Sequence, residues 1–236
     1  MVITEIFRSI QGEGTRAGLP CVFVRLTGCN LRCVWCDTAY AFHGGEKKTL
    51  NEVMDQVRML AAAPRQNGDA PGVPVGNAID LVEITGGEPL LQPECAPLAA
   101  ELLREGYTVM IETSGERPVA ALPREVIKIV DVKCPDSAEF GTFDMSNLEA
   151  VDAKDEIKFV LASRRDYEFA RDFTREHRLA GRVRQVIFSP VHADPAGKWP
   201  GLDARELAEW ILADGLPVRL GLQLHKFIWH PDTRGV

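Results

Sequence analysis

No stretch of the sequence approaches the roughly 18 consecutive apolar residues that a membrane-spanning helix requires. The chain also lacks an excess of positive charge, since 27 Lys and Arg residues face 34 Asp and Glu residues. A net charge of −7 argues against a nucleic-acid partner, because nucleic-acid-binding proteins usually present a basic face. The opening residues MVITEIFRSIQGEG show no basic stretch followed by an apolar one, so no secretory signal is expected. We therefore expect a cytoplasmic protein that acts on a small molecule.

Cysteine is scarce, with six residues in 236, and half of it lies in the stretch GCNLRCVWCDT (28–38). Such crowding is not typical of a secreted disulfide framework and indicates a reducing compartment. Cys29, Cys33 and Cys36 form a CxxxCxxC array. A structural zinc site normally closes with four protein ligands, and an ordinary iron–sulfur cluster is held by four cysteines. Three thiolates leave one metal position open, which favours chemistry, although a zinc site that recruits Cys21 or a histidine is an alternative.

Strand-like and helix-like segments alternate along the chain. Apolar and β-branched residues predict strands at 21–27, 79–85, 108–113, 127–132, 157–162, 183–189 and 218–228. Helices are predicted between Thr49 and about Ala63, from the GGEP turn to about Glu105, over about 163–178, and over 204–213. Residues 64–78 are rich in Pro and Gly and predict a loop.

This alternation predicts an α/β protein with a mostly parallel sheet covered by helices. Residues 115–123, which separate two of the strands, are too few for a full crossover helix. A complete eightfold barrel normally needs about 250 residues. The sequence therefore predicts a partial barrel from which some helices have been trimmed.

Polar or glycine-rich stretches directly follow five of the predicted strands. They are the cysteine loop, TGGEP (85–89), ETSG (112–115), DVKCP (131–135) and SPVH (189–192). The carboxyl ends of parallel strands meet on one rim, and function gathers there. We therefore expect all five stretches to contribute to a single site.

The array CNLRCVWC after one strand, with GGEP after the next, resembles the radical S-adenosylmethionine (SAM) superfamily. Within it, EIFRSIQGEG (5–14), CDT, TGGEP, IETSG and LQLHKFIW together resemble the 7-carboxy-7-deazaguanine synthases over nearly the whole chain. The resemblance implies a trimmed (β/α)6 radical-SAM barrel in a single domain, residues 1–236. Residues 1–19 would form an N-terminal substrate-binding extension, and residues 20–236 the partial barrel.

The resemblance also implies a reaction. The family converts 6-carboxy-5,6,7,8-tetrahydropterin to 7-carboxy-7-deazaguanine with loss of ammonia, on the way to queuosine and other deazapurines. Three thiolates would hold a [4Fe–4S] cluster whose fourth iron is chelated by SAM, a reusable radical source. Mg²⁺, a reducing electron donor such as a flavodoxin, and a homodimeric assembly are expected as well.

Roles for individual residues follow from the same resemblance. Cys29, Cys33 and Cys36 would bind the cluster, and the Thr38 hydroxyl would bind Mg²⁺. The substrate would contact Ile10, Gln11, Gly12, Arg25, Thr85 and Val236, with Arg25 pairing with the pterin carboxylate. SAM would contact Trp35, Asp37, Gly87, Ser114, Asp131, Lys133, Ser189 and His192. Glu13 and Glu112 are candidates for proton transfer, because a ring contraction that releases ammonia needs a nearby acid or base.

The chain departs from the family pattern in places. Some members end soon after the HK strand and bind the ring with their terminal carboxylate, whereas this chain continues past Pro231. Either Val236 supplies that carboxylate or a side chain such as Asp232 replaces it. Ser189 stands where some relatives have glutamine, and the role of Cys134 beside Lys133 stays open.

Two other functions remain alternatives. A glycyl-radical-enzyme activase has the same cysteine spacing, but QGEG and CDT argue against it. A non-enzymatic zinc-binding module is the second alternative.

Overall fold

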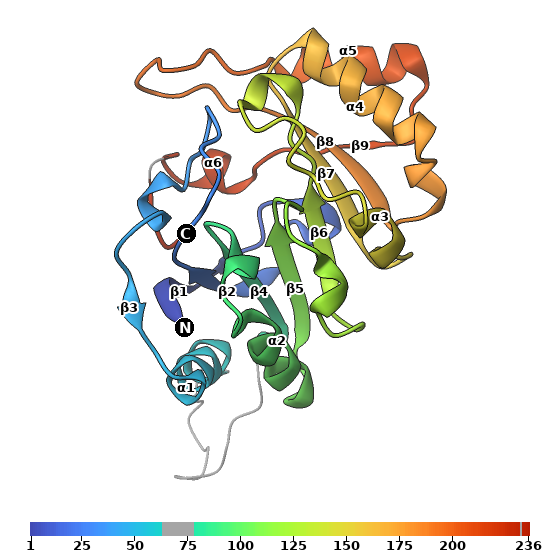
Figure 1. Ribbon diagram of the computed structural model, residues 1–236. Coiled ribbons are helices and arrows are strands. Elements are labelled where there is room, and N and C mark those ends of the chain that lie inside the picture. Colours follow the sequence, from blue (N-terminus) through green and yellow to red (C-terminus); the bar gives the residue numbers. More distant parts are fainter. Residues whose placement is uncertain (63–77, 232) are drawn as a thin grey trace.

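A computed structural model describes residues 1–62, 78–231 and 233–236 and shows one twisted sheet flanked by helices (Figure 1). The loop predicted at 64–78 lies outside the described residues except for Ala78, as does the predicted helix end at Ala63. In the described part of the chain, nine strands pair in the order β3-β1-β2-β4-β5-β6-β7-β8-β9. Their bounds are β1 Val2–Ile10, β2 Pro20–Leu26, β3 Glu46–Lys47, β4 Leu81–Gly86, β5 Thr108–Thr113, β6 Ile127–Asp131, β7 Glu156–Leu161, β8 Gln185–Pro190 and β9 Arg219–Leu220.

Strand β2 and strands β4 to β9 run parallel, and β1 pairs antiparallel with β2. All seven strands predicted from the sequence therefore contribute to the parallel segment, the last of them only over Arg219–Leu220, which confirms the α/β partial barrel. The extra strand β1 comes from the N-terminal extension, which the sequence did not predict as a strand. It lengthens the sheet at the edge next to β2.

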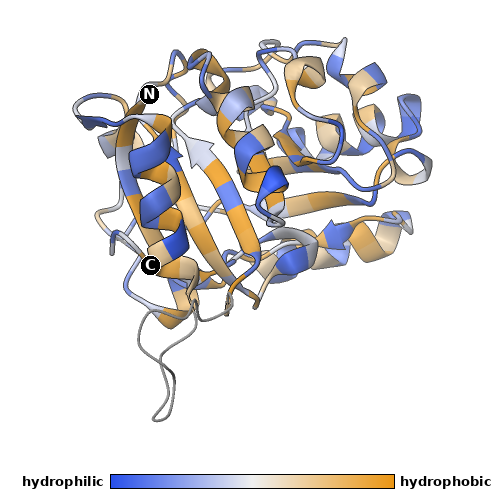
Figure 2. Ribbon diagram, turned by 90° about the horizontal axis from the view of Figure 1, so that it is seen from below, coloured by the Kyte–Doolittle hydropathy of each residue, from blue (hydrophilic) through white to orange (hydrophobic). Residues whose placement is uncertain are grey.

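Most of the helices cover the outer face of the sheet, and the strands are mostly hydrophobic (Figure 2). Their bounds are α1 Leu50–Ala61, α2 Cys95–Arg104, α3 Asn147–Ala150, α4 Arg164–Glu176, α5 Ala204–Asp214 and α6 His225–Ile228. The predicted capping box opens α1, because the Thr49 side chain accepts from the Glu52 backbone N–H and the Glu52 carboxylate accepts from Thr49. None of the helices in the described ranges is long and apolar enough to cross a membrane.

Two connections between parallel strands lack a full crossover helix, and the short spacing of residues 115–123 predicted the first of them. Between β5 and β6 the chain forms only the 3-10 turn η4, Val119–Ala121, and between β6 and β7 it forms η5, Pro135–Ser137, and the four-residue α3. The remaining 3-10 turns are η1 Gly14–Arg16, η2 Ala39–Ala41, η3 Pro89–Leu91 and η6 Leu179–Gly181.

The strand predicted at 218–228 is wrong beyond its first residues. Pairing covers only Arg219 and Leu220, although the Gly221 N–H still donates to the Phe188 carbonyl at 2.9 Å. Gly221 lies close to β8, where a Cβ would be 2.6 Å from Ile187 Cγ2 and from Ser189 Oγ. The chain then leaves the sheet, and the Leu224 N–H donates to the Gly12 carbonyl at 3.0 Å before α6 begins. The C-terminal segment thus packs on the loop that follows β1, and both termini lie on the β1 side of the sheet (Figure 1).

That loop reaches from β1 across to β7. The Thr15 N–H and hydroxyl both donate to the carboxylate of Glu156, a β7 side chain that is 1% exposed. Gly14 has a φ of +71°, and a Cβ there would lie 2.5 Å from Glu156 Oε2. The glycine therefore lets the backbone approach the carboxylate, and this contact anchors the QGEG segment inside the barrel.

Candidate active site

A cavity lies where the carboxyl ends of the barrel strands meet the two ends of the chain. Every predicted site residue except Ser189 lines it. From the N-terminal extension come Ile10, Gln11, Gly12 and Glu13; from the barrel rim come Arg25, Cys29, Cys33, Trp35, Cys36, Asp37, Thr38, Thr85, Gly87, Glu112, Ser114, Asp131, Lys133 and His192; and the C-terminal segment adds Val236. The predicted stretches thus form one site.

Ser189 takes a different place. It lies on β8, is 3% exposed, and its Oγ lies next to Gly221. In the described structure it does not line the cavity. Its predicted contact with the cofactor stays a prediction.

The cysteine loop after β2 is held by backbone hydrogen bonds. The Glu88 N–H donates to the Gly28 carbonyl at 2.8 Å, and the Val34 N–H donates to the Ser137 carbonyl at 3.1 Å. The TGGEP turn touches this loop at Gly87, where a Cβ would lie only 1.8 Å from the Gly28 carbonyl oxygen. The two loops can meet in this way only because residue 87 is glycine.

Substituting Gly87 with alanine is therefore expected to displace the cysteine loop. We expect the free energy of unfolding to fall by about 1–3 kcal/mol, as in other overpacked sites, measured by urea denaturation. Gly181→Ala is the matched control, because a Cβ at Gly181 meets no atom within 4 Å. Equal effects of the two substitutions would contradict the close approach.

All three thiols are free and line the cavity. Burial raises the pKa of each, to about 11 at Cys33, while the Lys133 ammonium acts in the opposite direction. Metal binding requires thiolates, so loading this loop releases protons. In the described residues no three His, Cys, Asp or Glu side chains converge as ligands of one ion do. An iron–sulfur cluster fits the three separate thiols, because each thiolate ligates a different iron.

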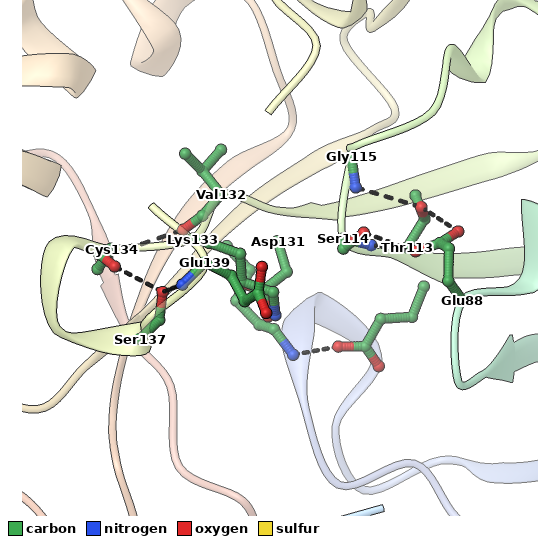
Figure 3. A network of polar contacts seen from close by, with 12 residues as sticks. Glu88, Thr113, Ser114, Gly115, Asp131, Val132, Lys133, Cys134, Ser137 and Glu139 are labelled. Carbon is green, nitrogen blue, oxygen red and sulfur yellow. Dashed lines mark hydrogen bonds and ion pairs between the residues drawn. The ribbon is translucent and has the colours of Figure 1, made fainter. Parts of the chain in front are cut away.

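Two neighbouring strand ends supply polar groups to the cavity that the thiols line (Figure 3). Glu88, 1% exposed, accepts from Thr113 Oγ1 at 2.7 Å and from the Ser114 N–H at 2.8 Å, which fixes the end of β5. At the end of β6, Lys133 Nζ lies 2.7 Å from Asp131 Oδ2. Within the described structure the buried Asp131 Oδ1 has no partner. A hydrogen-bond donor on a bound polar cofactor would satisfy this oxygen.

Arg25 extends from the end of β2. Its Nε donates to Glu5 Oε1 at 2.8 Å, and its Nη1 donates to the Gly86 carbonyl at 3.0 Å. The Tyr40 hydroxyl donates to the same Glu5 oxygen at 2.7 Å. In the described part of the chain, Nη2 has no partner and is available to an anion. Burial lowers the pKa of Arg25, but Tyr40 and Glu5 raise it by more. The net pKa lies above its ordinary value, and the guanidinium stays charged.

Thr38 lies two residues after the last thiol. Its hydroxyl donates to Asp37 Oδ1 at 2.8 Å, and Asp37 Oδ2 lies 2.6 Å from Lys226 Nζ. Burial favours the neutral acid, but Lys226, Thr38 and His225 together outweigh it and hold the pKa of Asp37 far below its usual range. The Thr38 oxygen can still accept, and it lies beside a carboxylate, which suits a hard cation.

Several lining residues were not predicted, namely Glu83, Lys158, Gln223, His225 and Lys226. Glu83 and Lys158 are charged residues within otherwise apolar strands, a sequence signal that was available. Gln223, His225 and Lys226 fell inside the wrongly predicted last strand. The candidate proton carriers Glu13 and Glu112 both contact Lys158.

The chain is similar to known proteins along its whole length. It matches the profile of the Radical SAM superfamily over residues 23–141. It is 53% identical to the 7-carboxy-7-deazaguanine synthase of Koribacter versatilis, with 100% of both chains covered. It is 40% identical to that of Chlorobaculum tepidum, over 99% of this chain and 96% of the other. The crystal structure of QueE from Escherichia coli, 24% identical, superposes with a TM-score of 0.69 over 95% of this chain and 94% of that one, a likeness of fold.

Proposed function

The chain belongs to the 7-carboxy-7-deazaguanine synthase family of the radical SAM superfamily, and we propose that its cavity carries out the reaction for which that family is named. The protein contracts the ring of 6-carboxy-5,6,7,8-tetrahydropterin to 7-carboxy-7-deazaguanine and releases ammonia, a step toward queuosine. One observation supports this most strongly. A single cavity is lined both by the three thiols and by the residues that the resemblance assigns to the pterin.

Anaerobic assay of the reconstituted protein with 6-carboxytetrahydropterin, SAM and a chemical reductant tests the function. The deazapurine and ammonia should appear in equal amounts. Consumption of SAM without formation of deazapurine would contradict the proposed function and favour the glycyl-radical-enzyme activase. Failure to retain iron would instead favour a zinc-binding module.

As a radical SAM enzyme, the protein uses a [4Fe–4S] cluster and SAM. Bound at the three thiols, they supply the one-electron chemistry that starts the reaction. Around them the chain provides polar groups for SAM, and the unpartnered Asp131 Oδ1 supports such a role. Gly87 lines the cavity next to the cysteine loop. Trp35, Asp37, Ser114, Lys133 and His192 line the same space.

The pterin would lie against the QGEG segment. Gln11 is 4% exposed and is held by Glu83, so its backbone and that of Ile10 and Gly12 present a fixed surface. Arg25 would bind the substrate carboxylate, with Thr85 beside it. Of the two alternatives for the far end of the ring, the position of Val236 in the cavity lining supports its carboxylate. Asp232 lies outside the described residues.

The Mg²⁺ site is proposed at Thr38, whose oxygen would share the ion with substrate oxygens and water. Thr38→Ala is expected to raise the Mg²⁺ concentration for half-maximal rate by about 10–100-fold, a usual cost of disturbing a metal site. Thr38→Ser keeps the hydroxyl and is the control. The iron–sulfur spectrum should be the same in all three proteins. Identical Mg²⁺ dependence in Thr38→Ala would contradict the site.

The remaining expectations are also proposals. The enzyme would act in the cytoplasm as a homodimer of single-domain chains, and it would receive its electron from a donor such as a flavodoxin. Gel filtration with light scattering tests the assembly. Reduction of the cluster by a purified flavodoxin, followed by optical absorbance, tests the donor.

A further inference from the structure

One lysine inside the cavity joins two carboxylates from distant parts of the chain. Lys158 lies on β7 and is 5% exposed. Its Nζ is 3.1 Å from Glu13 Oε2, in the loop after β1, and it also contacts Glu112 Oε1 on β5. In the sheet, β7 pairs only with β6 and β8. The side chain therefore makes these contacts across the barrel interior.

Glu13 is held in one orientation. Its Oε1 accepts from Gln223 Nε2 at 3.0 Å while its Oε2 pairs with Lys158, and its backbone N–H donates to Gln11 Oε1 at 2.9 Å. Gln11 Nε2 in turn donates to Glu83. Both oxygens of Glu13 are thus engaged.

Glu112 is held through Oε1 alone. Across the described residues, its Oε2 has no hydrogen-bond partner. The side chain lines the cavity. One oxygen is therefore left for a ligand or for a proton.

The site contains more negative than positive charge. Glu13, Glu83, Glu112 and Asp131 surround Lys158, and the other cations nearby are Arg25, Lys133 and the titratable His225. Four carboxylates this close together cannot all ionise cheaply beside Lys158 and these neighbouring cations.

The pKa values of Glu13 and Glu112 accordingly shift in opposite directions. Burial raises the pKa of Glu13, but Lys158, Gln223 and His225 outweigh it and leave the pKa below its ordinary value. Burial also raises the pKa of Glu112, and there Lys158 offsets it only in part. Such divergence is the usual mark of an acid and a base that share one site.

We infer that Lys158 is a positioning residue that fixes Glu13 and Glu112 in the cavity and determines which of them carries the proton. The inference rests on the proposed function, because it deepens the role of those two carboxyls. Glu13 then enters the reaction as the base and Glu112 as the acid. Lys158 touches neither substrate nor cofactor in this role and acts through the two glutamates.

A second buried lysine shows what a purely structural pair looks like. Lys128 is 4% exposed and lies 3.1 Å from Asp155 Oδ2. Asp155 also accepts from Lys154 Nζ and from the backbone N–H groups of Lys128 and Asp152. This carboxylate is fully satisfied by protein, and neither member of the pair lines the cavity. The Lys158 cluster differs because Glu112 keeps an open oxygen that faces ligand space.

The first test compares pH profiles of kcat and kcat/KM for the wild type, Lys158→Met and Lys158→Arg. Loss of the ammonium should raise both carboxyl pKa values, so the acidic limb of kcat/KM should move up by about 1–3 pH units in Lys158→Met. We also expect kcat to fall by about 10²-fold or more, the usual contribution of a positioned acid or base. Lys158→Arg should keep the wild-type profile. A lowered kcat with an unshifted profile would overturn the inference.

A double variant keeps the test valid if Lys158→Met folds poorly. Lys158→Met with Glu112→Gln removes the ammonium together with the one carboxyl on β5 that could ionise beside Glu13. The shift of the acidic limb should therefore be smaller than in the single variant. Additive effects of the two substitutions would mean that Lys158 and Glu112 are not coupled, and would overturn the inference.

Stability measured by urea denaturation separates this inference from the proposed function, since it needs no turnover. In Lys158→Met the folded pKa values of Glu13 and Glu112 should lie above their unfolded values. The stability from these groups is then complete at low pH and is lost as pH rises through the folded pKa. The variant should lose more stability relative to wild type at pH about 8 than at pH about 5. Equal losses would overturn the inference, whereas a wild type inactive on the pterin would overturn only the proposed function.

Discussion

Cys33→Ala is expected to prevent assembly of the cluster and to abolish turnover. Each of the three thiols would bind one iron, and Cys33 lies between the other two in the loop after β2. Without it, two thiolates cannot hold the cluster while its fourth iron stays open for SAM. Iron content after anaerobic reconstitution should fall well below the about four per chain of a [4Fe–4S] protein.

Cys95→Ala is the matched control for this experiment. Cys95 is also a free cysteine, but it is buried, begins α2 and packs in the core between that helix and the sheet. Its loss should cost about 1 kcal/mol of stability, as for a small core truncation, and leave iron and activity unchanged. A Cys33→Ala protein with full iron and full activity would refute the assignment of the thiols.

The residues at the rim of the barrel could be predicted from the sequence, because the carboxyl ends of parallel strands lie at the same edge of the sheet. Once 108–113 and 127–132 are recognised as strands, the residues that follow each of them must lie at the same edge. Ser114 and Lys133 therefore entered the predicted site although they are far apart in the chain, and both line the cavity. Local signals were sufficient for this step, as they were for the capping box at Thr49.

The C-terminal segment could not be predicted by the same means. The stretch VRLGLQLHKFI alternates like a strand, but Leu222 and Phe227 are 36% and 67% exposed. Its conformation is determined by contacts with remote residues, the Gly12 carbonyl and the Asp37 carboxylate. Tertiary contacts of this kind override a strand propensity that spans only about 1 kcal/mol.

The charged cluster inside the barrel was missed for a related reason. Lys158 sits in the apolar strand IKFVLA, where an isolated lysine gives no indication of its partners. Those partners, Glu13 and Glu112, come from elements that do not pair with β7. Their proximity depends on how far the barrel curves and on where the QGEG loop crosses it, and neither can be derived from residue spacing.

The N-terminal loop and the C-terminal segment together complete the cavity lining that the trimmed barrel leaves open. Thr15 is bound to Glu156 on β7, and Gln223 is bound to Glu13 in the same loop. The parallel strands of the barrel supply the rim that holds the thiols, while the N-terminal loop and the C-terminal segment supply the opposite lining. The barrel rim and the two ends of the chain therefore share the lining of one cavity.

Substitution of Arg25 tests substrate selection most directly. Arg25→Ala should raise KM for the carboxypterin. A hydrogen-bonded pair with a charged group is worth about 1.5–3 kcal/mol, so the expected increase is roughly 10–150-fold. Because the carboxylate contact is present in both the bound ground state and the transition state, kcat should change less than KM. Arg25→Lys should recover only part of the loss, since an ammonium cannot reproduce the planar fork.

A tetrahydropterin without the carboxylate shows whether this effect comes from the carboxylate contact or from damage to the site. As a competitive inhibitor it should bind the wild type and Arg25→Ala equally well, because it has nothing for the guanidinium to bind. Removing Arg25 also leaves Glu5 without its ion-pair partner, so Arg25→Ala with Glu5→Gln should repeat the KM effect with less loss of stability. Equal weakening of the inhibitor and the substrate by Arg25→Ala would mean that Arg25 only maintains the rim of the barrel, and the carboxylate would have to be bound elsewhere.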